Sequence, residues 1–178
     1  CSKVFFDESK KMGCDPIMER TGHSPIKEKM KELKSPLSGE MSGHVCYGDD
    51  FYGYDDAMYV ALRLIRILSN QENNLFNIID QYPKTFSTPE TRFDVEEIKK
   101  FKIIDDIKER LKNIDGKIID IDGIRVETDK GWFLMRASNT QNQLTCRVES
   151  TSESGLRKLI AIVEDQLKLS DVNFQFTI

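Results

Sequence analysis

Three β-rich segments follow one another between residues 117 and 135, and short turn sequences separate them. The segments span residues 117–121, 124–128 and 132–135. The spacers are Asp122-Gly123 and Asp129-Lys130-Gly131, which favour the tight turns of β-hairpins. Because such turns join neighbouring antiparallel strands, this stretch is predicted to fold as an antiparallel meander around which the rest of the second half packs.

Apolar residues at helical or alternating spacing flank the meander. The segment Asp94-Val95-Glu96-Glu97 has the spacing of a capping box, which predicts that a helix begins there. The stripes that flank the meander are Phe101, Ile104, Ile107 and Leu111 for that helix, Leu144, Cys146 and Val148 for a strand, Leu156, Ile160, Val163 and Leu167 for a second helix, and Val172, Phe174, Phe176 and Ile178 for a last strand. The second half is therefore predicted to be an α+β domain, a small antiparallel sheet with helices on one face.

The first half alternates helices with short strands, which is typical of a parallel α/β sheet. The predicted elements are a helix over residues 4–12, a strand at 16–18, a helix with its N-cap at Ser24-Pro25, strand and loops within 35–54, and a helix capped by Asp55 or Asp56 over 57–68. The last helix has a broad apolar face and is expected to be largely buried. The strands are few for such a sheet, so we expect a partial parallel α/β domain whose beginning is missing.

Residues 70–89 are rich in Asn, Gln, Pro, Ser and Thr, a composition typical of linkers. We therefore place the domain boundary there. Residues 1–86 form the partial α/β domain, and residues 87–178 form the α+β domain.

Charge and cysteine content narrow the choice of partners. With 26 basic and 30 acidic residues, the chain has a net charge of −4, which argues against nucleic acid and membranes as partners. The most apolar segment, residues 59–68, contains Arg63 and Arg66, so no membrane span is expected. The four cysteines have no C-x-x-C spacing, which argues against a zinc site and a disulfide framework. A soluble, cytoplasmic protein is predicted.

Both histidines lie in glycine-rich loops. His23 stands in Arg20-Thr21-Gly22-His23-Ser24, and His44 ends the sequence Gly39-Glu40-Met41-Ser42-Gly43-His44. On an extended backbone, the side chains of residues 40, 42 and 44 would project to one side. Such a row of carboxylate, hydroxyl and imidazole can hold vicinal sugar hydroxyls and move a proton. The alternative interpretation is a solvated loop histidine.

A second polar group follows the strand at residues 132–135. Arg136 offers a planar fork that matches two phosphate oxygens, and Ser138, Asn139 and Thr140 add short donors. An ordinary solvated turn is the alternative interpretation. The paired aspartates at 49–50 and 55–56 lack the spacing of metal ligands, so we interpret them as loop and capping residues and predict no metal ligands in the chain.

These motifs, in this order, resemble the phosphohexomutase superfamily, and specifically its bacterial phosphomannomutase/phosphoglucomutase branch. Residues 20–27 are similar to a loop of the third domain, residues 39–44 to the sugar-recognition loop, and residues 131–140 to the phosphate-binding loop of the fourth domain. Met41 and Ser138-Asn139-Thr140 favour the mannose/glucose branch over phosphoglucosamine mutases. The resemblance covers nearly the whole chain and implies the C-terminal half of such an enzyme. Residues 39–44 are called the sugar loop below, and residues 136–140 the phosphate loop.

The resemblance implies an isomerase that moves a phosphoryl group between the 1- and 6-positions of a hexose, through a phosphoserine and a bisphosphate intermediate. It implies catalytic roles for His44 and His23. The implied sugar-binding residues are Glu40, Ser42, Arg20, Thr21 and Gly22, and the implied phosphate-binding residues are Arg136, Ser138, Asn139 and Thr140. It also implies Mg²⁺ and a hexose 1,6-bisphosphate activator.

The family's serine loop Thr-Ala-Ser-His-Asn-Pro and metal loop Asp-Gly-Asp-Gly-Asp-Arg do not occur in this sequence. The chain is therefore expected to need the family's N-terminal domains as partners, for the nucleophile and the Mg²⁺ ligands, and to be inactive alone. Asn142 stands where proline is frequent, and Arg20 where lysine is frequent. Two alternatives stay open: a non-catalytic sugar-phosphate-binding or interaction module, and a structural domain with vestigial motifs. These residues do not rank mannose against glucose.

Overall fold

The computed structural model describes residues 1–176, and residues 177–178 lie outside the description. The contacts within the chain divide it into two units, Cys1–Pro83 and Lys84–Ile178. This division falls three residues before the boundary placed from the composition. Each unit is described by itself.

Unit 1 contains four helices and one β-hairpin among its described residues. These are α1 (Lys3–Lys11), α2 (His23–Leu33), β1 (Leu37–Gly39), β2 (Val45–Tyr47), α3 (Ala57–Ser69) and α4 (Leu75–Ile79). β1 and β2 pair antiparallel, with Gly39 opposite Val45. The hairpin contacts α2 through β1 and α3 through β2.

Local side chains explain where the helices of unit 1 begin. The Ser2 hydroxyl accepts the backbone N–H of Val4 and caps α1. The Asp56 carboxylate accepts the N–H of Tyr59 at 2.9 Å and caps α3, so Asp56 rather than Asp55 is the capping residue. The expected N-cap at Ser24 is wrong, because α2 begins at His23 with Gly22 as its N-cap.

Three further expectations for unit 1 differ from the structure. Residues 16–18 form a loop rather than a strand. The two described strands pair antiparallel rather than parallel, because the five-residue connection between them turns the chain straight back. α3 is not buried: Leu62 and Ile65 are 62% and 61% exposed. The hairpin contacts α3 through β2, where Tyr47 packs edge-to-face against Tyr59, and Leu62 and Ile65 remain exposed.

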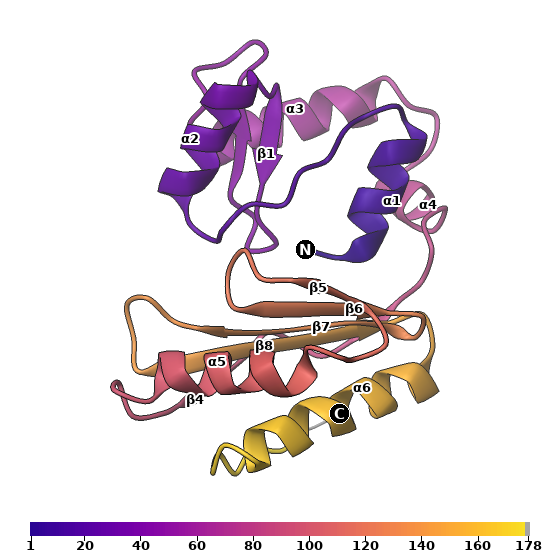
Figure 1. Cartoon of the computed structure of the whole chain (residues 1–178). Coiled ribbons are helices and arrows are strands. Elements are labelled where there is room, and N and C mark those ends of the chain that lie inside the picture. The colour runs from indigo at the N-terminus through magenta and orange to yellow at the C-terminus, as the bar shows by residue number, and fades with distance from the viewer. Residues whose placement is uncertain (177–178) are drawn as a thin grey trace. The chain divides into compact units, whose positions relative to one another are not determined.

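Unit 2 is built on a six-stranded antiparallel sheet within its described residues. Its elements are β3 (Phe86–Ser87), β4 (Thr91–Asp94), α5 (Lys100–Leu111), β5 (Lys117–Ile119), β6 (Ile124–Thr128), β7 (Gly131–Ala137), β8 (Gln143–Ser150) and α6 (Glu153–Lys168). The meander runs β5-β6-β7-β8, and both β3 and β4 pair with the far edge of β8. α5 and α6 lie on the same face of the sheet (Figure 1). The predicted meander and the mixed α/β class are confirmed.

The core of unit 2 lies between the sheet and these two helices. Alternate residues of β6, β7 and β8 point into it and meet the apolar stripes of α5 and α6. The fully buried members include Ile107, Val126, Phe133, Val148 and Val163. Burying a side chain of this size contributes about 1.5–3 kcal/mol, which makes this layer the main source of stability for unit 2.

Three expectations for unit 2 are corrected. Asp94 does not cap a helix: it ends β4, and its carboxylate accepts from the Gln143 side chain at 2.9 Å, so α5 begins only at Lys100. Residues 172–176 are not a strand, and Ile178 lies outside the described residues. β3 and β4 had not been anticipated. Thr88, which follows β3, exchanges two hydrogen bonds with Val148 of β8.

Among the described helices, none is both long and apolar enough to cross a membrane.

Candidate functional site

The sugar loop is the turn of the hairpin between β1 and β2. The Glu40 N–H donates to the His44 carbonyl at 2.8 Å, and the Gly43 N–H donates to the Glu40 carbonyl at 3.0 Å. Gly43 has φ of +91°, a conformation that favours glycine. The expected extended row of residues 40, 42 and 44 is therefore wrong. The chain reverses at Met41 and Ser42, so Glu40 and His44 face each other across the base of a turn with Ser42 exposed at its tip.

The two glycine-rich loops of unit 1 meet. The Gly22 N–H donates to Glu40 Oε1 at 3.0 Å, across 18 positions of sequence. Gly22 is the N-cap of α2 and has φ of +127°, so this contact places the carboxylate beside the N-terminus of the helix. A carboxylate at a helix N-terminus is favoured by the helix dipole. The contact fixes one oxygen of Glu40 and thereby the direction in which the second oxygen can accept from a ligand hydroxyl.

His44 pairs with Asp55. The distance from His44 Nδ1 to Asp55 Oδ2 is 2.6 Å, and the His44 side chain is 61% exposed. The hydrogen bond from His44 holds the pKa of Asp55 below its ordinary value, and the Val45 backbone and the charge of Lys27 act in the same direction. An ionised carboxylate only accepts hydrogen bonds, so Nδ1–H donates to it, and in the neutral imidazole Nε2 is then the acceptor on the opposite edge of the ring.

Asp55 is a residue that the sequence analysis did not assign to the site. It had been interpreted as a cap or a solvated loop residue. The sequence does contain a signal for a second role of Asp55. Two adjacent aspartates precede α3, and one helix needs only one cap. Asp56 takes that role, and Asp55 instead forms a β-bridge with Cys46 that brings its carboxylate to His44.

The remaining predicted residues of unit 1 lie near the N-terminus of α2. His23 is the first residue of the helix and is exposed, and its Nδ1 lies 3.4 Å from the Ser24 hydroxyl. The Arg20 guanidinium lies 3.7 Å from Glu19, and the Arg20 N–H also donates to Glu19. Thr21 is exposed beside Gly22. These residues flank Gly22 in the sequence, and Gly22 is where the two loops meet.

Arg136 lies on the face of β7 that points away from the helices, opposite Thr145 of β8. Its side chain is mostly buried, and its Nη1 lies 3.9 Å from Asp122 Oδ2. The neighbouring Gly123 packs directly on Arg136: a Cβ at Gly123, which has φ of +79°, would lie 2.6 Å from the Arg136 Cβ. The β5–β6 turn therefore fixes the position of the arginine.

The rest of the phosphate loop is a turn held by its own serine. Ser138 Oγ accepts the N–H groups of Thr140 and Gln141 at 3.3 and 3.1 Å, and the Ser138 N–H donates to the Gln143 carbonyl. The oxygen of the Ser138 hydroxyl therefore stabilises the turn, as the alternative interpretation predicts. The hydrogen of the same hydroxyl is left to donate to a ligand. Asn139 and Thr140 are exposed at the tip. The carbonyl of Asn142 accepts the Val95 N–H at 2.8 Å, which fixes this position although it is not proline.

Residues 1–176 contain no group of three or more His, Cys, Asp or Glu side chains placed to hold a metal ion. Asp49 pairs instead with Arg63 at 2.7 Å, and Asp50 lies 3.7 Å from the same guanidinium. The backbone N–H of Asp50 and the Arg63 side chain lower the pKa of Asp49. These aspartates serve an ion pair on the surface of α3.

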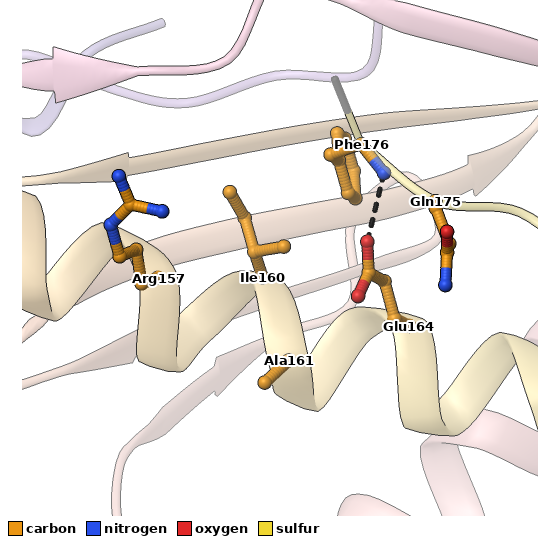
Figure 2. A pocket seen from close by; sticks show the side chains of 6 residues that line it. All are labelled: Arg157, Ile160, Ala161, Glu164, Gln175 and Phe176. Atoms are coloured by element: carbon orange, nitrogen blue, oxygen red, sulfur yellow. Dashed lines mark hydrogen bonds between the residues drawn. The ribbon is translucent and has the colours of Figure 1, made fainter. Parts of the chain in front are cut away.

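Figure 2 shows an open pocket between α6 and the segment after it, lined by Arg157, Ile160, Ala161, Glu164, Gln175 and Phe176. The Phe176 N–H donates to Glu164 at 2.8 Å across this pocket. It contains none of the residues that the sequence assigned to a site.

Comparison with known proteins agrees with the motifs. Residues 1–86 match a family model described as phosphoglucomutase/phosphomannomutase, alpha/beta/alpha domain III, and residues 90–166 match the C-terminal domain model of the same family. The chain is 42% identical to a phosphomannomutase/phosphoglucomutase of Pseudomonas aeruginosa, over 89% of the chain and 34% of that relative. It is 38% identical to a phosphoglucomutase of Neisseria gonorrhoeae, over 89% of the chain and 36% of that protein.

A crystal structure of a phosphoglucomutase/phosphomannomutase family protein from Burkholderia thailandensis is similar over 99% of the chain, with a TM-score of 0.88 and 34% identity, and the chain covers 38% of it. The chain thus spans about a third of the length of the curated relatives it matches.

Proposed function

The chain belongs to the phosphoglucomutase/phosphomannomutase family, and on this premise we propose that it supplies the ligand-holding part of a hexose-phosphate mutase. In this proposal unit 1 binds the hydroxyls of the sugar and moves the proton of the reacting hydroxyl. Unit 2 holds the phosphate that does not react in a given half of the cycle. The observation that carries the proposal is the hydrogen bond between Gly22 and Glu40, which joins the two loops that the family motifs mark.

The sugar is held by Glu40 and Ser42, with Arg20, Thr21 and Gly22 beside them. The fixed carboxylate of Glu40 accepts from ring hydroxyls, and Ser42 at the exposed tip of the turn can both donate and accept. Hydroxyls on the same ring positions are present in the 1-phosphate and the 6-phosphate. One loop can therefore serve both half-reactions without changing its shape.

His44 is the proposed general acid and base, with Asp55 as the residue that positions it. Asp55 holds the Nδ1–H tautomer and stabilises the imidazolium, so Nε2 can take the proton of the hydroxyl that attacks phosphorus and return it in the reverse step. The same division of roles between carboxylate and imidazole operates in hydrolase triads. His23, at the start of α2, is the proposed second donor to the reacting group.

The phosphate is held by Arg136, Ser138, Asn139 and Thr140. The Arg136 guanidinium can bind two phosphate oxygens at once, and the ligand then competes with Asp122 for the same cation. The hydroxyls and the amide of the exposed tip complete the shell around the phosphate. Such preorganised donors are the usual means of stabilising a dianionic group.

The described residues offer no set of side chains that fits a Mg²⁺ site. We propose that the Mg²⁺ ligands and the phosphoserine lie on the N-terminal domains of the family, outside this sequence, and that a hexose 1,6-bisphosphate activates the enzyme. A cytoplasmic location, and the absence of nucleic acid and membrane partners, belong to the same proposal. The exposed apolar face of α3, which includes Leu62 and Ile65, supports a protein partner for unit 1.

A complementation assay tests the proposal. The chain is mixed with a separately produced polypeptide comprising the first two thirds of the Pseudomonas aeruginosa relative, with Mg²⁺ and glucose 1,6-bisphosphate, and the conversion of mannose 1-phosphate and glucose 1-phosphate is followed. We expect activity from the mixture and none from either part alone. We expect Glu40→Gln and Arg136→Ala to reduce the activity of the mixture.

Two results would contradict the proposal. Activity of the contaminant-free chain alone would show that it holds its own nucleophile. Binding of glucose 1-phosphate without complementation would instead favour the non-catalytic sugar-phosphate-binding module.

A further inference from the structure

Lys100 is a buried lysine at the first position of α5. Its side chain is only 2% exposed, whereas lysine is almost never fully buried unless its charge is paired. The neighbouring Lys99, one position earlier, is 60% exposed. The groups that the buried Lys100 ammonium binds therefore indicate why a charge is kept at this position.

The Lys100 ammonium binds two groups from different parts of unit 2. Nζ donates to Glu97 Oε2 at 2.9 Å and to the backbone carbonyl of Gln141 at 3.0 Å. Glu97 lies one turn before it, but Gln141 lies 41 positions later and directly follows the phosphate loop. Lys100 therefore ties the start of α5 to the phosphate loop.

Gln141 is held at both of its backbone groups, the N–H and the carbonyl. Its N–H donates to Ser138 Oγ at 3.1 Å, and its carbonyl accepts from Lys100. Because Ser138 Oγ accepts this N–H, the position of Gln141 decides which way the serine hydroxyl hydrogen can point. The ammonium thereby acts on Ser138 through the backbone of a single residue, Gln141.

The other contacts on this side of the loop belong to the sheet. Asp94 and Gln143 are paired residues of β4 and β8, and the Val95 N–H continues that ladder to the Asn142 carbonyl. A sheet of this register makes those contacts whatever the loop binds. The Lys100 contact is made by a side chain and is not required by the ladder.

We propose that Lys100 is a positioning residue for phosphate binding, because its ammonium holds the phosphate loop in the conformation in which Ser138 and the tip residues face the phosphate. The inference rests on the proposed function of that loop. It adds a residue that does not touch the ligand and that no motif marked.

Lys100→Met tests the inference, because methionine keeps the aliphatic stem in the core and removes only the ammonium. Lys99→Met is the matched control, since Lys99 makes the same kind of ion pair with Glu96 but is exposed. Lys100→Arg tests rescue, because arginine restores a donor for the Gln141 carbonyl. Leu159→Ala, on the core-facing side of α6, controls for a general loss of stability.

Two quantities are measured on the whole chain by NMR. The first is the affinity for glucose 1-phosphate, and the second is the hydrogen exchange of the Thr140 and Gln141 amides without ligand. We expect Lys100→Met to weaken binding by about tenfold, which is the size of effect expected from losing about one hydrogen bond, and to speed exchange of the Gln141 amide. We expect Lys100→Arg to recover part of both, and Lys99→Met to match the parent.

The inference is overturned if Lys100→Met matches the parent in affinity, or if Leu159→Ala weakens binding as much as Lys100→Met at equal thermal stability. A parent chain that does not bind glucose 1-phosphate, or an Arg136→Ala variant that binds it equally well, contradicts the proposed function instead. In that case the exchange of Gln141 still decides whether Lys100 holds the loop: unchanged exchange in Lys100→Met overturns the anchoring as well.

Discussion

Asp55 accepts the Nδ1 hydrogen of His44 at 2.6 Å, although the two residues are 11 positions apart and β2 lies between them. The bridge between Cys46 and Asp55 sets this distance, because it lays the segment before α3 alongside β2. The imidazole is therefore oriented by backbone pairing, and its Nε2 direction is fixed before any ligand arrives.

Asp55→Asn should reduce turnover by the complemented enzyme by about 10²-fold or more, because an amide can hold the wrong imidazole tautomer and does not stabilise the imidazolium. Substrate binding should change little, since Glu40 and the phosphate loop are untouched. The measurement is kcat and KM for mannose 1-phosphate over a range of pH. Asp56→Asn is the matched control, because it stands next to Asp55 but caps α3. Equal loss in both variants would mean that the α3 terminus, and not the His44 pair, is what matters.

The pKa of Asp55 should lie below its ordinary value of 3.8 in the folded chain, mainly because of the hydrogen bond from His44. A depressed pKa means that the pair stabilises the fold above the unfolded value and that this contribution is lost as pH falls through the folded value. Carbon-13 NMR titration of the carboxyl groups measures it. In His44→Ala the pKa of Asp55 should rise, while that of Asp49, held down by Asp50 and Arg63, should stay low. An unchanged pKa of Asp55 in His44→Ala would contradict the pairing of His44 with Asp55.

Gly123→Ala should destabilise unit 2 by about 2 kcal/mol or more, because residue 123 has positive φ and any Cβ collides with Arg136. Urea unfolding followed by the fluorescence of Trp132, the single tryptophan, reports on this unit. Asp120→Ala, an exposed change near the same turn, should stay within about 0.5 kcal/mol of the parent. Phosphate affinity should fall in the first variant only. A parent-like Gly123→Ala would show that the turn does not fix Arg136.

The exposed face of α3 should make the chain self-associate when it is alone, since apolar surface of this kind is normally covered. The double variant Leu62→Lys, Ile65→Lys should shift the chain toward the monomer in size-exclusion chromatography without loss of helical circular dichroism. Ser69→Lys adds charge to the same helix and keeps the apolar face, so it should behave as the parent. A monomeric parent that binds no hydrophobic dye would contradict the prediction. In the complementation assay the double variant should restore less activity.

Local patterns predicted unit 2 well, because its meander depends on turns that are encoded in two or three residues. The α6 stripe through Val163 is likewise confirmed. The α5 stripe is confirmed at Ile104, Ile107 and Leu111, but Phe101 is 52% exposed, and Ile103 is buried in its place. The family motifs also marked both glycine-rich loops of unit 1, but they did not predict the hydrogen bond between Gly22 and Glu40 that joins them.

Some features could not be predicted because a residue that is distant in the sequence takes the hydrogen bond of a side chain. Asp94 had the spacing of a cap, but its carboxylate is taken by Gln143, which is 49 positions away in sequence. Lys100 had no signal, because its partner is a backbone carbonyl 41 positions later. The alternation of apolar residues over 172–176 reflects partial burial and not strand pairing. Phe174 stacks on Phe93 with 4.7 Å between the ring centroids and packs at the edge of the core, without forming a strand.

The segment that connects α4 to unit 2 joins the sheet within a few residues of the end of α4. Phe86 and Ser87 already pair with β8, and Thr88 is bonded to it twice. The backbone torsions that neither α4 nor β3 restrains therefore lie between residues 80 and 85. Pro83 removes one of these, because its ring locks φ. The linker that the composition of this stretch predicts is therefore short and locally stiffened, and it is not a long flexible tether.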